Sequence, residues 1–200
     1  PQAPPAPVVI NEFSYDDSST DDYEFVELFN ASDAPVDLTG WILDSEDPFG
    51  PNDAFPITDG TILQPGDYWV MGSDLVPNVD QIVGTTNIWE NGQDSLTLRD
   101  AGGLSEGIWG NFTSIAGIET SWSRGRDGLD TDDNGNDFRI MPWTPGTTND
   151  VANLLPYQPD IDAQLVGDDF TDWSGSWVAP IVIDPTVVDA ANPNVIPASP

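Results

Sequence analysis

The sequence predicts an all-β protein in which two sheets pack together as a sandwich. Eight short apolar runs are separated by turns rich in Gly, Pro, Asn and Asp. Several runs alternate apolar and polar side chains with the period of two that a half-buried strand requires, and none shows the 3.6-residue period of a helix. Short strands at this spacing are typical of β-sandwiches.

The predicted strands cover residues 8–13, 23–30, 36–43, 61–72, 81–86, 94–100, 107–112 and 120–125. In the second of these, Val26 and Leu28 face one side of the strand and Glu27 faces the other. In the fourth, the sequence LQPGDYW predicts a turn that leads into a strand, with Gly66 taking a positive φ.

Proline-rich segments flank the predicted sandwich. We expect an extended N-terminal arm at residues 1–7, the sandwich at residues 8–150, and a C-terminal extension at residues 151–200 with one or two strands. The apolar run WVAPIVI has no evident partner, and its addition to an exposed sheet edge would join two chains. Docking of the extension on its own sandwich is the alternative. The predicted assembly residues are Trp173, Trp177, Val178, Ile181 and Ile183.

The charge is strongly unbalanced. Thirty-five acidic residues oppose four basic ones, all of them Arg, and the formal net charge is −31. Because like charges repel, the folded state needs counterions, supplied either by high salt or by bound divalent cations. We therefore expect a hypersaline or a calcium-rich extracellular setting. Nucleic acid is disfavoured as a direct partner, because its phosphates carry the same sign of charge.

The absence of three residue types removes whole classes of chemistry. His, Cys and Lys do not occur in the sequence. Ser-His-Asp and Cys-His nucleophiles, most zinc sites, Schiff-base lysines and P-loop lysines are therefore impossible. Carboxylate pairs, as in glycoside hydrolases, remain. No stretch approaches the roughly twenty apolar residues of a membrane span.

The acidic run DGLDTDDNGNDF resembles the first half of a calcium-binding loop. Counting from Asp130, oxygen-bearing side chains occupy positions 1, 3, 5 and 7, and Gly135 occupies position 6, where such a loop bends. The Glu that completes the loop at position 12 is missing, because that residue is Met141. A solvated acidic turn is the alternative. The predicted calcium ligands are Asp127, Asp130, Asp132, Asn134, Asn136 and Asp137.

Other acidic residues are weaker candidates for calcium. The loops at residues 16–22 and 44–53 are more typical of plain acidic turns. Glu12 and Glu27 lie within apolar strands, where a metal-binding pair or a glycosidase dyad would explain them. The simpler interpretation is that each carboxylate faces solvent or accepts hydrogen bonds from the backbone or Arg. The additional candidate ligands are Glu12, Glu27, Asp16, Asp17, Asp21, Asp22, Asp44 and Asp47.

The aromatic residues and two glycosylation sequons complete the set of candidate sites. Five of the eight Trp residues lie in strand-like sequence and are expected in the core, namely Trp41, Trp69, Trp89, Trp109 and Trp122. Trp143, Trp173 and Trp177 are candidates for exposure or subunit contacts. The sequons NAS and NFT mark Asn30 and Asn111 as candidate glycosylation sites.

Several segments together resemble the lamin tail domain family, in its prokaryotic secreted or surface branch. The runs VVINEF, YEFVELFN, VDLTGWIL, LQPGDYWVMG and DSLTLRDAGG, then SWSRGRDG and TPGTTN, occur in the order and spacing of that family over about residues 8–150. Asn11, Glu12, Glu27 and Asn30 match residues typical of it. The resemblance implies an immunoglobulin-like β-sandwich with no assigned activity of its own.

These observations predict a non-enzymatic extracellular structural protein. We expect a calcium- or salt-stabilised sandwich that assembles with copies of itself into a filament, sheath or surface layer. A module that binds polysaccharide or another surface protein is the alternative, and a carboxylate-based glycoside hydrolase is a remote one. The chain begins at PQAPP without an initiator Met, as expected of a processed mature form or a trimmed piece.

The charge predicts that folding depends on cations. Lowering the ionic strength should lower the melting temperature, because repulsion among the acids is then less screened. A specific calcium site predicts a further rise when calcium replaces sodium at constant ionic strength, of about 2–4 °C for each kcal/mol of binding. Thermal melting with calcium and with chelator measures both effects. An unchanged melting temperature in dilute, metal-free buffer would contradict the expectation.

Overall fold

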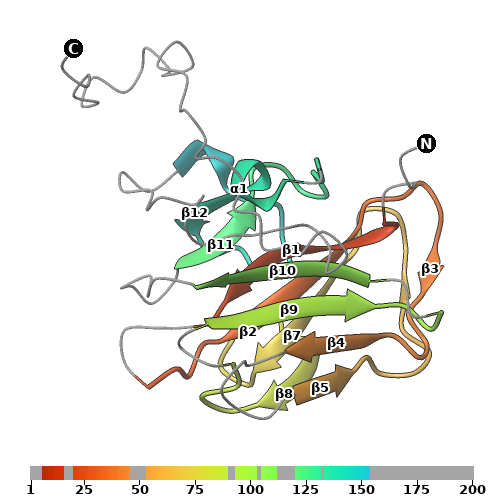
Figure 1. Ribbon diagram of the computed structural model, residues 1–200, viewed down its shortest axis with the longest axis horizontal. Helices are drawn as coiled ribbons and strands as arrows, with labels where there is room; N and C mark the ends of the chain where they lie inside the picture. Colours follow the sequence, from red (N-terminus) through yellow and green to blue (C-terminus); the bar gives the residue numbers. More distant parts are fainter. Residues whose placement is uncertain are drawn as a thin grey trace.

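Two β-sheets face each other across a single large core in the computed structural model (Figure 1). The structure describes residues 6–15, 20–45, 53–89, 93–102, 105–111, 120–131 and 133–153. The predicted all-β, immunoglobulin-like sandwich is confirmed. The elements are β1 Val8–Ser14, β2 Phe25–Asn30, β3 Val36–Asp37, β4 Ile42–Ser45, β5 Asp53–Pro56, β6 Ile62–Leu63, β7 Tyr68–Ser73, β8 Gln81–Gly84, β9 Gln93–Arg99, β10 Ser105–Asn111, β11 Thr120–Arg124, α1 Asn134–Asp137, β12 Phe138–Pro142 and the 3-10 turn η1 Val151–Asn153.

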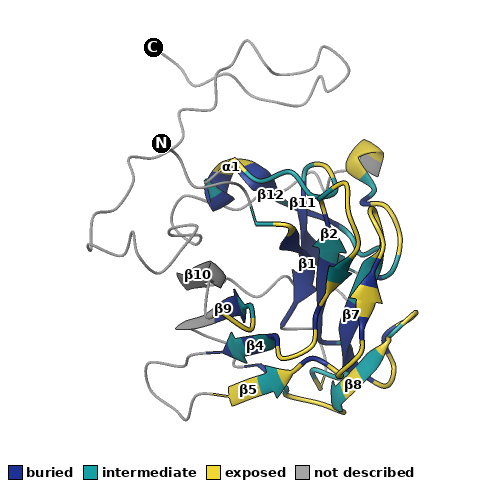
Figure 2. Ribbon diagram, turned by 90° about the vertical axis from the view of Figure 1, so that its right-hand side faces the viewer, coloured by how far each residue is buried: buried dark blue, intermediate teal, exposed yellow. Residues whose placement is uncertain are grey.

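The larger sheet has six strands in the order β12-β11-β1-β2-β7-β8, and the smaller has four in the order β10-β9-β4-β5. A two-stranded sheet, β3-β6, lies beside them. Within the six-stranded sheet β8 runs parallel to β7, whereas the other strand pairs are antiparallel. The centre of this sheet, β1 and β2, is buried almost completely (Figure 2).

The core is filled by side chains that alternate along the strands of both sheets. Val26 and Leu28 of β2 meet Leu43, Leu96 and Leu98 of the four-stranded sheet within one buried cluster, as the alternation predicted. Of the five Trp residues expected in the core, Trp41, Trp89 and Trp122 are buried, Trp69 is half-buried against the cluster, and the side chain of Trp109 lies outside the described residues.

Two predicted strands are each divided by a turn. The interpretation of residues 36–43 as one strand is wrong, because Gly40 takes a φ of +78° and turns the chain between β3 and β4. The chain thereby passes from the two-stranded sheet to the four-stranded sheet. Residues 61–72 divide in the same way into β6 and β7, and Gly66 in the intervening turn has the expected positive φ, +81°.

Strands β5 and β12 were not predicted. The sequence of β5, DAFP, contains Asp and Pro and looks like the end of the preceding acidic loop. That of β12, FRIMP, is short and follows another acidic run, although Phe138 and Ile140 do alternate toward the core. Among the described residues, no helix is long and apolar enough to cross a membrane.

An extra residue in β1 decides which of its side chains face outward. Ile10 lies opposite Leu28, and Glu12 lies opposite Glu27, so Asn11 is the additional residue of a β-bulge. A bulge shifts the alternation of a strand by one position. Core side chains therefore occupy even positions before the bulge and odd positions after it.

The shift places two consecutive polar residues on the same side of the sheet. Ile10 before the bulge and Phe13 after it both belong to the core cluster, whereas Asn11 and Glu12 both lie on the opposite, outer face. Both are nevertheless fully buried. A further segment of the chain must therefore cover this part of the outer face.

Candidate functional site: a buried carboxylate clasp

Two glutamates lie side by side in the middle of the six-stranded sheet. Glu12 of β1 and Glu27 of β2 are direct cross-strand partners, which places their Cβ atoms about 4.5–5.5 Å apart on one face. Both side chains have no exposed surface. Of the alternatives in the simpler interpretation, the structure shows acceptance of backbone hydrogen bonds, and neither carboxylate faces solvent.

The cover over this pair is residues 143–149, which we call the clasp. The clasp follows β12 and crosses the outer face of the sheet. Its Thr144 donates from the backbone N–H to Glu12 Oε1 (2.7 Å) and from the hydroxyl to Glu12 Oε2 (2.9 Å). Gly146 donates its N–H to Glu27 Oε2 (2.6 Å). Each glutamate thus binds the clasp directly.

The sheet supplies the remaining donors to the pair. The Ser121 hydroxyl of β11 donates to Glu12 Oε1 (2.6 Å), and the Asn11 amide donates to Glu27 Oε1 (2.8 Å). Asn11 also accepts a bond from the N–H of Gly128 (3.0 Å), so the bulge residue connects the pair to the loop after β11. The bulge therefore places Asn11 where its amide can join three segments.

A third carboxylate, Asp127, lies at the edge of the pair. Its Oδ1 accepts bonds from the Asn11 amide (3.1 Å) and from the N–H of Asn149 at the end of the clasp (3.1 Å). Its Oδ2 accepts a bond from the hydroxyl of Tyr68 in β7 (2.8 Å). The two glutamates and Asp127 together hold the clasp at Thr144, Gly146 and Asn149.

Local sequence gives the clasp its shape. Pro145 and Gly146 form the tip of a turn closed by the Thr147 N–H bond to the Thr144 carbonyl (2.9 Å), and Gly146 has a φ of +77°. The Asn78 amide donates to the Pro145 carbonyl (2.8 Å). A Cβ on Gly146 would lie 2.8 Å from the Asn78 Cβ, so the tip has room only for Gly.

The clasp also covers a small second apolar cluster. Trp143 is half-buried against Phe25 and Val70, with its ring centroid 6.0 Å from that of Phe25 and 5.8 Å from that of Tyr23. Trp143 is therefore partly covered rather than fully exposed, and its role in subunit contacts stays a prediction. The aromatic packing anchors the first residue of the clasp to the sheet.

Burial dominates the electrostatics of the pair. Desolvation raises the pKa of Glu12 to about 7, although the donors Ser121 and Thr144 offset part of the rise. Desolvation, and then the charge of Glu12, raise the pKa of Glu27 to about 8. Partial burial beside Asp127 also raises the pKa of Tyr68 to about 12, which keeps its hydroxyl a donor.

The acidic run at residues 127–137 is organised around an arginine. The Arg124 guanidinium lies 3.1 Å from an oxygen of Asp137 and 3.7 Å from one of Asp130, and it donates to the Ile10 carbonyl (2.7 Å). Thr131 donates to both Asp137 oxygens (2.7 and 2.8 Å). Burial raises the pKa of Asp137, and these donors and Arg124 partly offset that rise.

The remaining predicted ligands of this loop have other contacts. Asn136 donates its backbone N–H to Asp133 (3.2 Å), which caps the single-turn helix α1, and Asn134 is the first residue of this helix. Asp132 lies outside the described residues. Among the residues the structure describes, no three acidic, His or Cys side chains converge as metal ligands do. Calcium in this loop stays a prediction.

Among the described residues, the weaker metal candidates do not form a group of three that could hold an ion. Asp44 in β4 pairs with Arg99, and Asp22 accepts a bond from the Thr20 hydroxyl. Asp21 has a positive φ of 54° in the turn before β2. Glu12 and Glu27 hold the clasp, and we treat them as structural acceptors. Asp16, Asp17 and Asp47 lie outside the described residues.

The sequon at Asn30 does not offer an accessible amide. Asn30 is 1% exposed, and its Nδ2 donates to the carbonyls of Ala34 and Leu63 (both 2.9 Å). Glycosylation of Asn30 is therefore incompatible with this fold. Asn111 ends β10, but its side chain is outside the described part, as are the predicted assembly residues Trp173, Trp177, Val178, Ile181 and Ile183.

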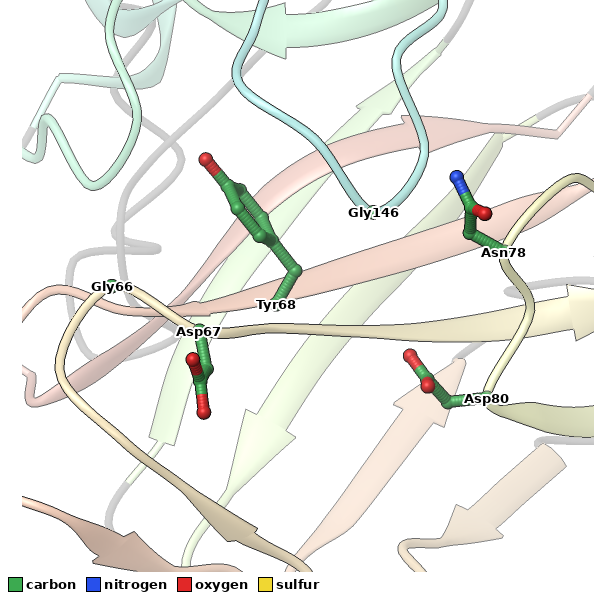
Figure 3. Close-up of a pocket in the computed structure, with 6 residues that line it drawn as sticks. All are labelled: Gly66, Asp67, Tyr68, Asn78, Asp80 and Gly146. Carbon is green, nitrogen blue, oxygen red and sulfur yellow. The ribbon is translucent and has the colours of Figure 1, made fainter.

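A shallow groove runs beside the tip of the clasp. Figure 3 shows Gly146 descending between Tyr68 and Asn78. Gly66, Asp67 and Asp80 complete the lining of this hollow, whose volume is about 420 Å³. Asp67 and Asp80 each accept a bond from a backbone N–H, of Gln64 (2.8 Å) and Val70 (2.9 Å) respectively.

Comparison with known families shows which family the chain belongs to. The family model described as the Lamin Tail Domain matches residues 1–111. The chain belongs to the lamin tail domain family. No match was found among curated proteins. The matched part of this lamin tail domain ends with β10 and contains both glutamates, whereas the donors Ser121, Thr144 and Gly146 come after it.

Sequence reasoning found the two glutamates but not their cover. Both were notable as acids within apolar strands, and their pairing was one of the predicted alternatives. The clasp was missed because TPGTTN looks like an ordinary turn, and its contacts join residues 132 positions apart in the chain. The polar pair NE within VVINEFSY, where apolar residues change from even to odd positions, was the available indication of the bulge.

The tip of the clasp predicts a specific steric effect. Gly146→Ala should lower the free energy of unfolding by about 2–3 kcal/mol, because Ala is strained at positive φ and its Cβ meets Asn78. Gly60→Ala is the matched control, since Gly60 has a φ of +84° but open space around it, and should cost only about 1 kcal/mol. Urea unfolding measures both. Equal losses would show that the clasp tip is not tightly seated.

Proposed function

We propose that this lamin tail domain is a non-enzymatic structural module. The observation that carries the proposal is that Glu12 and Glu27 are buried and hydrogen-bonded within the protein. Glu12 and Glu27 have no exposed surface, and each of their oxygens accepts a hydrogen bond from the protein. A glycosidase dyad must instead contact a substrate and a water molecule. The pair serves to hold the chain together rather than to cut another molecule.

We further propose that the module is extracellular and assembles with copies of itself through its C-terminal extension. The clasp immediately precedes that extension, so its hydrogen bonds would carry any tension from the extension into the centre of the larger sheet. The apolar run at residues 177–183 carries no charge, which would let it approach a chain with a net charge of −31 without adding to the repulsion.

An edge of the larger sheet is suited to receive such a segment. β8 is an end strand and pairs only with β7 within the described sheet. Its Ile82 is 60% exposed. An uncharged strand that added to this edge would gain backbone hydrogen bonds and cover that apolar side chain.

The alternative is a module that binds polysaccharide or another surface protein. The groove beside Tyr68 favours it, because an aromatic ring next to Asp67, Asn78 and Asp80 could stack on a sugar and bind its hydroxyls.

Light scattering of the full chain separates these proposals. Assembly predicts particles larger than a monomer, and Ile181→Asp with Ile183→Asp should convert them to monomers by placing charges in the added strand. Ser174→Asp is the matched control, because it adds a charge outside the apolar run. Unchanged particle size in the double variant would contradict assembly. Monomers of the unaltered chain that are retained on immobilised polysaccharide would favour the binding module.

A further inference from the structure

The outer face beneath the clasp carries ionisable groups of a single sign. Glu12 of β1, Glu27 of β2 and Asp127 of the loop after β11 are acids, and Tyr68 of β7 is the remaining titratable group in their hydrogen-bond network. β11 contributes the neutral Ser121 and Ser123. The clasp, WTPGTTN, has no ionisable side chain.

The nearby arginines are directed elsewhere by their hydrogen bonds. Arg124 donates to the carbonyls of Ile10 and Leu129 and to Asp137. Arg139 donates to the carbonyls of Gly135 and Phe138. Arg126 is exposed. The acids under the clasp therefore depend on hydrogen-bond donors rather than on these cations for stabilisation.

Two full negative charges are difficult to hold in this place. The cross-strand register brings Glu12 and Glu27 together, and both are excluded from water. In such surroundings, like charges repel far more strongly than in solvent, and one retained proton removes most of that repulsion. When the last proton leaves, the charges are relieved only if water reaches them.

The clasp is the segment that can move away from the two glutamates. Strands β1 and β2 are fixed by ladders on both sides and by the main core, whereas the clasp has no strand pairing. Apart from its bonds to the acids, the clasp is held by the packing of Trp143 and by three hydrogen-bonding contacts. These are the Asn78 bond to the Pro145 carbonyl (2.8 Å), the Asn149 amide bond to the Arg124 carbonyl (2.9 Å), and the contact between the Thr148 and Tyr68 hydroxyls (3.2 Å). Lifting it would hydrate both glutamates and leave the two sheets intact.

We propose that the clasp is a pH-responsive lock, closed while the Glu12–Glu27 pair retains a proton and released when both carboxyls ionise. Release would detach from the sheet the segment that precedes the C-terminal extension, and it would uncover Phe25 and Val70. The pH response of the clasp does not depend on what the extension binds, so this proposal can hold even if the proposed self-assembly is wrong.

The raised pKa values of the two glutamates agree with release of the clasp at high pH. Folded-state values of about 7 for Glu12 and about 8 for Glu27 lie above the ordinary value of 4.5. A raised acid pKa means that the closed state binds protons more tightly than the open state. Proton binding therefore stabilises the closed clasp fully at pH values below the ordinary pKa of Glu. This stabilisation declines as the pH rises above that pKa, and it is lost above the two folded-state pKa values.

Amide NMR of the full chain tests the lock directly. The N–H groups of Thr144 and Gly146 bond to the two carboxylates, so their chemical shifts should titrate with midpoints near or above neutrality. Protection of residues 143–149 against hydrogen exchange should fall at least about ten-fold between about pH 6 and about pH 9. Val26 and Leu28 of β2 should keep their protection.

Matched variants keep the test decisive. Glu27→Gln removes one charge, so the Thr144 midpoint should move toward the ordinary Glu value and clasp protection should lose most of its pH dependence. If that variant does not fold, Asp127→Asn should lower both midpoints by removing the neighbouring charge. Asp59→Asn, which removes an exposed acid, should change neither. Midpoints at the ordinary Glu value, or clasp protection that does not change with pH in the unaltered chain, would overturn the proposal.

Discussion

The bulge at Asn11 is the constraint on which the rest of the arrangement depends. By shifting the alternation of β1 it directs Phe13 into the core and Glu12 to the outer face, directly beside Glu27. A buried carboxylate without donors is costly, so an acid pair placed there requires a cover that supplies N–H and O–H groups. Thr144 and Gly146 supply them, and this requirement explains why the chain crosses the sheet after β12.

The same need to neutralise acids appears elsewhere in the fold, with a different solution in each place. Asp44 pairs with Arg99 across the smaller sheet, and Asp137 and Asp130 surround Arg124. The acid pair under the clasp is instead stabilised by neutral donors. The net charge of −31 leaves most other acids to be balanced from solution, which is the physical basis of the expected dependence on salt or calcium.

Much of the fold could be predicted because it follows from local patterns. The alternation of Val26 and Leu28 with Glu27 gave the inward and outward faces of β2, and the positive φ of Gly66 followed from its turn. The divided strand at Gly40, strand β5 and the clasp could not be predicted in the same way, because pairing with distant segments decides them. Asn30 shows the limit of a motif, since its sequon is intact but its amide is buried in hydrogen bonds to Ala34 and Leu63.

The family match places the two glutamates in the part shared with other lamin tail domains, whereas the clasp residues lie beyond the matched part. Glu12 binds the clasp through the backbone N–H and the hydroxyl of Thr144. A double-mutant cycle with Glu12→Gln and Thr144→Val, measured by urea unfolding, tests this interaction most directly. We expect a coupling of about 1–3 kcal/mol, and additivity when Thr147→Val replaces Thr144→Val. Additive losses, within about 0.5 kcal/mol, for Glu12→Gln with Thr144→Val would contradict the account.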